Sequence, residues 1–222
     1  MDDVVEQARR GRSHLERALP PGTELRGFST HLSITVPDRG DVRRSTRFIR
    51  TYASTLALLL DRADSPGLLV RPRPGRLELC GEFADGERLR VAAAYAIASV
   101  RALVEDPSGN RDLELDATTE PSRQRYGAFV GPTAFGADLY RTGRATSLRR
   151  RRGGMVTAQE QMEATWERCR SAASARLSAA DRRAVDAVIA GSAPLPAVPL
   201  PVRPRPEAHR VADRAADRAA GT

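Results

Sequence analysis

Two alternating stretches of the chain carry polar side chains that could bind an anion or a metal ion. Residues 28–36 place one polar series on alternate positions: Ser29, His31, Ser33 and Thr35. Residues 76–83, RLELCGEF, place a second series on alternate positions: Arg76, Glu78, Cys80 and Glu82. Successive side chains of a strand point to opposite faces, so each series would share one face. The opposite, buried face would carry the apolar residues Phe28, Leu32, Leu77 and Leu79. If both strands join one sheet, His31, Arg76, Glu78 and Glu82 meet on its open face, although antiparallel sheets commonly turn such a face to water.

The segment RPRPG at 71–75 adds two arginines immediately before the second polar series. Its two prolines lack backbone N–H groups, which predicts a stiff extended loop rather than a central strand. Arg71, Arg73 and Arg76 therefore form a pre-organised group suited to phosphate or carboxylate recognition. A carboxylate and an imidazole beside an anionic ligand could also hold a hard cation such as Mg²⁺.

A second basic run, Arg149 to Arg152, follows Arg141 and Arg144 and could neutralise several phosphates. Aromatic residues make up only 5% of the chain, and no recognisable nucleic-acid motif accompanies the run. Binding of nucleic acid is therefore only the third interpretation, and it is not the expected one.

Composition excludes several classes of site. The net charge is +8, and all 36 basic residues are arginine. Because the chain has no lysine, neither a lysine Schiff base nor a lysine-containing phosphate loop is possible. Cys80 and Cys169 lie far apart and outside any CxxC spacing, which argues against a disulfide framework or a structural zinc site. The charged N-terminal sequence does not resemble a signal peptide, and the longest apolar runs are far too short to cross a membrane. We therefore expect a cytoplasmic protein without membrane contact.

Hydrophobic periodicity predicts an α+β fold, in which a small, mostly antiparallel sheet has one polar face and helices pack on its other face. The predicted strands span 25–36, 68–70 and 76–83, with a further strand at 113–117. The predicted helices span 2–19, a long segment after 41, 87–104, 132–144, a long segment from 157 and a last segment from 178 to 190. Thr157 and Glu160 would form a capping box, Ser178 would cap the last helix, and the basic run at 148–154 would form a loop. Residues 1–191 would form a single domain. Residues 192–222, rich in Pro, Ala and Arg, would form a disordered tail.

Three segments resemble the later half of the carboxylate–amine ligase superfamily. They read GTELRGFSTHLSITVP, SPGLLVRPRPGRLELCGEF and RYGAFVGPTAFGADLY. The superfamily includes glutamate–cysteine ligase-like enzymes and amidoligases that share the glutamine synthetase fold. The resemblance implies an ATP- and Mg²⁺-dependent enzyme that joins a small carboxylate to an amine. It implies metal contacts from His31 and Glu78 and phosphate contacts from Arg71, Arg73, Arg76 and Arg125. Glu82, on the same strand face as Glu78, is the third predicted metal residue.

The chain also departs from that pattern. The family opens its sheet with a strand of alternating carboxylates that hold metal, whereas only a helix and a loop precede His31 here. Glu114 and Asp116 form the one alternating pair, but they come too late in the order. Cys80 replaces an arginine and is expected to be a small buried residue without an adjacent histidine. Two alternatives therefore stay open: a ligase whose site a partner chain completes, and a non-catalytic binding or assembly module derived from that fold.

Overall fold

The computed structural model of the protein describes residues 2–20, 22–23, 27–37, 42–63, 65–106, 111–121, 127–172 and 175–195. An antiparallel sheet of five strands forms its centre, in the order β1-β3-β2-β5-β4. The strands are β1 (Ser29–Thr35), β2 (Leu68–Arg73), β3 (Arg76–Glu82), β4 (Glu120–Pro121) and β5 (Ala128–Val130). A separate hairpin pairs β6 (Ser147–Arg149) with β7 (Met155–Thr157).

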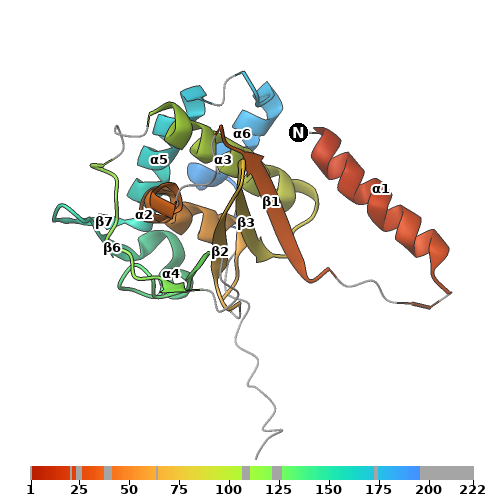
Figure 1. Cartoon of the computed structure of the whole chain (residues 1–222), viewed down its shortest axis with the longest axis horizontal. Coiled ribbons are helices and arrows are strands. Elements are labelled where there is room, and N and C mark those ends of the chain that lie inside the picture. The colour runs from red at the N-terminus through yellow and green to blue at the C-terminus, as the bar shows by residue number, and fades with distance from the viewer. Residues whose placement is uncertain are drawn as a thin grey trace, which may run out of the picture.

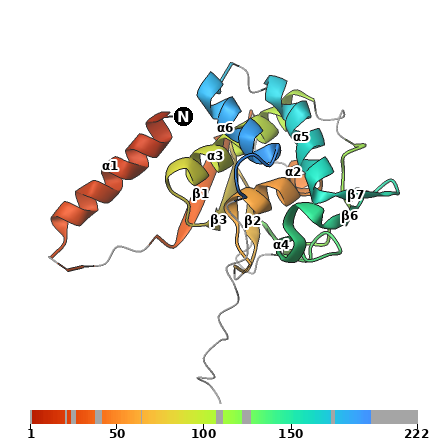
Figure 2. The same cartoon turned by 180° about the vertical axis from the view of Figure 1, so that it is seen from behind.

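Helices cover one face of this sheet in two layers (Figures 1 and 2). The inner layer consists of α2 (Val42–Leu60) and α3 (Gly86–Glu105), and the outer layer of α5 (Ala158–Ala172) and α6 (Ala179–Ile189). The short α4 (Leu139–Thr142) and the 3-10 turn η1 (Gly143–Ala145) lie beside them. The predicted α+β class, with helices on one face of a mostly antiparallel sheet, is confirmed.

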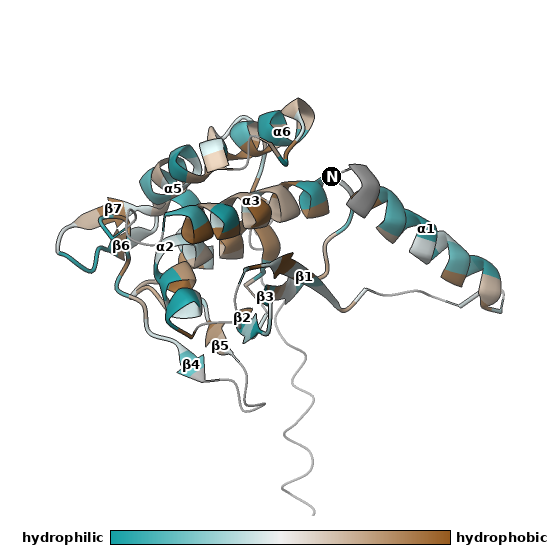
Figure 3. Ribbon diagram, turned by 45° about the horizontal axis from the view of Figure 1, so that its top comes forward, coloured by the Kyte–Doolittle hydropathy of each residue, from teal (hydrophilic) through white to brown (hydrophobic). Residues whose placement is uncertain are grey.

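Alternation of apolar residues fixes which face of the sheet is covered. Ile34, Leu77 and Leu79 are buried against the helices, and the run at 56–60 on α2 is almost completely buried. Figure 3 shows hydrophobic segments along both α2 and α3, and most of the buried residues of the two helices are apolar. Each apolar side chain removed from water contributes about 1.5–3 kcal/mol, so this packing sets the orientation of the strands. Phe28 was expected on the same buried face, but it precedes β1 and is 93% exposed.

The arginine-rich segment differs from its predicted form. β2 continues through Arg71, Pro72 and Arg73, and it lies between β3 and β5 rather than ending at Val70. β5 pairs only with residues 68–70, so Pro72 lies beyond the stretch where β2 has a partner on both sides. Pro74 and Gly75, with a φ of 70° at Gly75, then close a tight turn into β3. A proline is therefore tolerated in this nominally central strand.

Three further predictions need correction. Residues 113–117 contain only an isolated bridge between Leu115 and Arg150 instead of a strand. The basic run at 148–154 is part of the β6–β7 hairpin rather than a loop, and the predicted helix at 132–144 shortens to α4. The predicted caps are confirmed: Thr157 and Glu160 bond reciprocally before α5, and Ser178 caps α6.

The first and last described segments pack on the domain to different extents. α1 (Asp2–Ala18) is helical as predicted, and it lies apart from the sheet with its contacts on α3 (Figure 1). Residues 192–195 pack on the domain through Leu195, contrary to the expected disorder, and the rest of the predicted tail lies outside the described residues. Among the described helices, none is long and apolar enough to cross a membrane.

Candidate functional site

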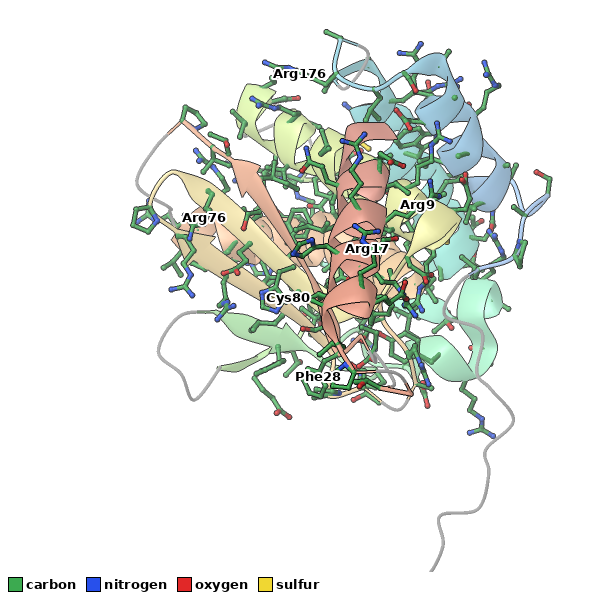
Figure 4. The ribbon with its side chains drawn as sticks, turned by 90° about the vertical axis from the view of Figure 1, so that its right-hand side faces the viewer. Arg9, Arg17, Phe28, Arg76, Cys80 and Arg176 are labelled. Atoms are coloured by element: carbon green, nitrogen blue, oxygen red, sulfur yellow. The ribbon has the colours of Figure 1, made fainter. Side chains whose placement is uncertain are left out.

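The outer face of the sheet collects the polar residues that the alternation predicts. Strand pairing sets His31 opposite Cys80, and it sets Glu78 between Ser33 on β1 and Arg71 on β2. The same face continues toward the β2–β3 turn, where Arg73 pairs with Arg76. Figure 4 looks toward this side of the molecule, with Cys80 near the middle, Arg76 near the turn and α1 passing in front. We call His31, Arg71, Arg73, Glu78 and Cys80 the sheet-face cluster.

Glu78 is the centre of the sheet-face cluster. Its Oε1 lies 3.3 Å from Nδ1 of His31. Its Oε2 accepts a hydrogen bond from Nε of Arg73 at 3.2 Å and lies 3.1 Å from Nε of Arg71 as an ion pair. One largely buried carboxylate therefore fixes two guanidinium groups side by side.

The charge on Glu78 follows from these contacts. Burial by itself would raise the pKa of the carboxyl group, but the hydrogen bond from Arg73 and the positive charge of Arg71 outweigh it, and the pKa is lowered. Glu78 is consequently ionised at neutral pH. Its negative charge orients the two arginines while leaving the cluster with a positive excess.

Cys80 has a histidine neighbour that the sequence did not suggest. His31 is its pairing partner across the β1–β3 ladder, and Nη2 of Arg71 lies 3.7 Å from its Sγ. Burial raises the pKa of the thiol, and the nearby negative charge of Glu78 raises it further. Cys80 therefore stays protonated at neutral pH and is not an activated nucleophile, as expected of a small buried residue.

The metal-binding capacity of the cluster differs in kind from the expected magnesium site. The ligand atoms of His31, Glu78 and Cys80 all lie within 4.8 Å of one another. Mg²⁺ prefers oxygen ligands in an octahedron, whereas an imidazole and a thiol are typical ligands of Zn²⁺. Because Oε2 of Glu78 is occupied by arginines, a single carboxylate oxygen remains beside the imidazole and the thiol. This donor set does not fit Mg²⁺.

We expect Co²⁺, a spectroscopic substitute for Zn²⁺, to bind the cluster and to give a thiolate-to-metal absorption band. The band should be absent in Cys80→Ser, because the serine hydroxyl has no sulfur to bond to the metal. Mg²⁺ in excess should not displace Co²⁺ from the cluster. Cys169→Ser serves as the matched control, since that thiol is also fully buried but lies on α5. A band that persists in Cys80→Ser, or that Mg²⁺ removes, would contradict this assignment.

The remaining predicted site residues are not part of the cluster. Glu82 lies opposite Ser29, four residues along β3 from Glu78, or about 13 Å away at strand spacing, so one cation cannot bridge the two carboxylates. Arg76 is exposed at the end of the hairpin. Arg125 lies outside the described residues.

The carboxylate pair considered as a substitute metal strand also lies elsewhere. Glu114 contacts Arg47 of α2 and Arg151 of the β6–β7 hairpin, on the helical side of the sheet. Glu114, Arg47 and Arg151 thus form a second charged group. The arginines of α2 give no distinctive signal in the sequence, because they alternate with apolar residues as on any amphipathic helix.

Comparisons of the chain with protein-family models, with curated proteins and with solved structures found no match.

Proposed function

We propose that the protein is a ligase-like binding module, whose sheet-face cluster holds the phosphate or carboxylate group of a small anionic ligand. The observation that carries the proposal is the pair of guanidinium groups fixed side by side by Glu78. Planar guanidinium groups recognise phosphate and carboxylate oxygens in a bidentate manner, and fixing them beforehand lowers the entropy lost on binding. The resemblance to carboxylate–amine ligases points to a nucleotide or an amino acid as the ligand class.

We further propose that this chain alone does not turn over ATP. Phosphoryl transfer depends on metal ions that neutralise the developing charge, and the cluster offers Mg²⁺ a single carboxylate oxygen next to a thiol. Losing one such electrostatic interaction costs roughly 10²–10³ in rate, so several losses would reduce turnover below detection.

A second candidate function is a ligase completed by a partner chain. β1 is an edge strand of the described sheet, paired with β3 on one side. An edge strand offers a row of backbone groups to which a strand from another chain can add. A partner strand with alternating carboxylates, added next to His31, would supply the metal ligands that the described residues lack.

The test is calorimetric titration of the full chain with ATP, inorganic phosphate and glutamate. Arg73→Ala should weaken binding of the preferred ligand about tenfold or more, because a hydrogen bond to a charged group contributes roughly 1.5–3 kcal/mol. Arg170→Ala is the matched control: it removes the same charge from an exposed pair with Asp186 on the outer helical layer.

The outcomes separate the two candidates. Binding that Arg73→Ala weakens and Arg170→Ala leaves unchanged, without release of ADP, supports the binding module. Release of ADP with Mg²⁺ and an amino acid only after addition of a partner chain that carries a strand of alternating carboxylates supports the assembled ligase, and release of ADP by this chain alone contradicts both candidates. Equal affinity of wild type and Arg73→Ala for every ligand would contradict the sheet-face assignment.

A further inference from the structure

A second basic site lies on the helical side of the sheet, around the first half of α2. A cavity of about 550 Å³ is lined there by six arginines and one glutamate, an excess of five positive charges. The arginines come from three separate segments of the chain: Arg43, Arg47, Arg50, Arg111, Arg151 and Arg152. We call it the arginine cavity.

Local structure explains why these side chains converge. Residues 43, 47 and 50 recur at helical spacing, so they project from one side of α2. The backbone N–H of Leu115 donates to the carbonyl of Arg50, and that of Arg151 donates to the carbonyl of Glu114. These bonds hold the 111–117 segment between α2 and the β6–β7 hairpin. The arginine cavity is therefore built by backbone contacts.

Glu114 plays the same part in the arginine cavity that Glu78 plays on the sheet face. Its two carboxylate oxygens lie 3.6 Å from Nε of Arg47 and 3.7 Å from Nη1 of Arg151, and the residue is buried. A single carboxylate orients arginines from two elements without neutralising the lining. Like charges gathered around one cavity raise its positive potential and attract anions.

A second cavity, of about 480 Å³, adjoins the first and differs from it chemically. The two share Val42, Thr46 and Arg50, so they meet along the same side of α2. Ile49, Pro72, Ala117 and Ala128 are among the residues on its other walls, and Arg50 is the one charged residue in its lining. The combined groove thus has a strongly basic end and an uncharged, mostly apolar end.

We propose that this groove binds a di- or triphosphate ester, with its phosphates in the arginine cavity and its uncharged organic body in the adjoining cavity. Several guanidinium groups match two or three phosphates, which carry about three to four negative charges near neutral pH. The apolar end distinguishes such an ester from inorganic pyrophosphate, because only the ester can bury an organic body there. The site is independent of the sheet-face cluster and lies on the opposite side of the sheet.

The experiment is calorimetric titration of the full chain with ATP, farnesyl diphosphate and pyrophosphate, which share phosphate chemistry and differ in the attached body. We expect one of the two esters to bind more tightly than pyrophosphate. Arg47→Gln and Arg151→Gln should each weaken that ester roughly tenfold or more. Ala117→Gln should weaken the ester and leave pyrophosphate unchanged, because the longer side chain occupies only the apolar end.

Two controls keep the result interpretable. Arg176→Gln removes one positive charge from an exposed turn and should leave every affinity unchanged. Arg73→Ala should leave the ester bound in the groove, which separates this site from the sheet-face cluster even if binding there fails. Equal affinity for both esters and pyrophosphate, or loss of ester binding in Arg73→Ala with retention in Arg47→Gln, would overturn the proposal. Tighter binding of a single-stranded RNA oligonucleotide would overturn it in favour of a nucleic-acid surface.

Discussion

Replacing Asp181 by alanine is expected to lower the free energy of unfolding by about 2–5 kcal/mol, the cost of losing a hydrogen bond to a charged group together with a helix cap. The Asp181 side chain is completely buried, and its Oδ1 accepts a hydrogen bond from Nε of Arg90 at 2.8 Å. Its Oδ2 accepts hydrogen bonds from the hydroxyl and the backbone N–H of Ser178, which completes the cap of α6. The substitution therefore loses the α3–α6 ion pair and the cap together.

The same contacts predict a dependence on pH. Burial would raise the pKa of Asp181, but the hydrogen bonds from Ser178 and the ion pair with Arg90 outweigh it, and the pKa is lowered. A carboxylate whose pKa falls on folding stabilises the protein above its unfolded pKa of about 3.9, and this contribution is lost as pH falls through the folded value. The difference in stability between wild type and Asp181→Ala should therefore shrink below about pH 4.

Urea unfolding followed by circular dichroism measures both effects, and Asp112→Ala is the matched control. The Asp112 side chain also pairs with one arginine, Arg168 at 3.7 Å, but both side chains are largely exposed. An exposed ion pair contributes about 0–1 kcal/mol, so this variant should unfold almost as wild type does. Equal losses in the two variants would mean that α6 is not held through Asp181.

The fold could be predicted as far as alternation and helical spacing determine it. The two polar series on β1 and β3 show their faces directly in the sequence, because a strand has only two faces. Pairing register is not visible in one strand, and for this reason the pairing of His31 with Cys80 was missed. Glu82 was grouped with Glu78 because the two share a strand face, although the rise per residue already separates them by about 13 Å. A one-residue change of register would move every side chain of a strand to the opposite face of the sheet. The hydrophobic pattern therefore determines which face of each strand is buried, but not which residue of the neighbouring strand lies opposite.

Other features depend on contacts that no local pattern encodes. Pro72 argues against a central strand until one knows that β5 is too short to reach it. The arginines of α2 resemble an ordinary solvated helix side, and they gain a role only when the 111–117 segment and the β6–β7 hairpin close over them. Long-range assembly of short segments accounts both for the wrong prediction at Pro72 and for the site on α2 that was not predicted.

Replacing Gly127 by alanine is expected to lower the free energy of unfolding by about 3 kcal/mol and to weaken ligand binding at the sheet face. Gly127 has a φ of 138°, which side-chain-bearing residues rarely adopt. A Cβ at this position would lie 2.7 Å from the carbonyl oxygen of Val70 and 2.5 Å from Cγ of Arg71. Relieving the first contact separates β5 from β2, and relieving the second moves Arg71 away from Glu78.

Gly136→Ala separates the two causes of that loss, because Gly136 also has a positive φ, of 82°, but has open space where a Cβ would lie. In Gly136→Ala the free energy of unfolding should fall by about 1–2 kcal/mol, the cost of placing a side-chain-bearing residue at a positive φ. The affinity for the sheet-face ligand should be unchanged. Thermal unfolding and the phosphate and glutamate titrations measure both quantities on each variant, and ATP is not used as a probe here because Gly127 also lines the second cavity of the groove. If Gly127→Ala binds and unfolds as Gly136→Ala does, the turn before β5 relaxes freely, and the backbone beside Arg71 does not hold the sheet-face cluster in place.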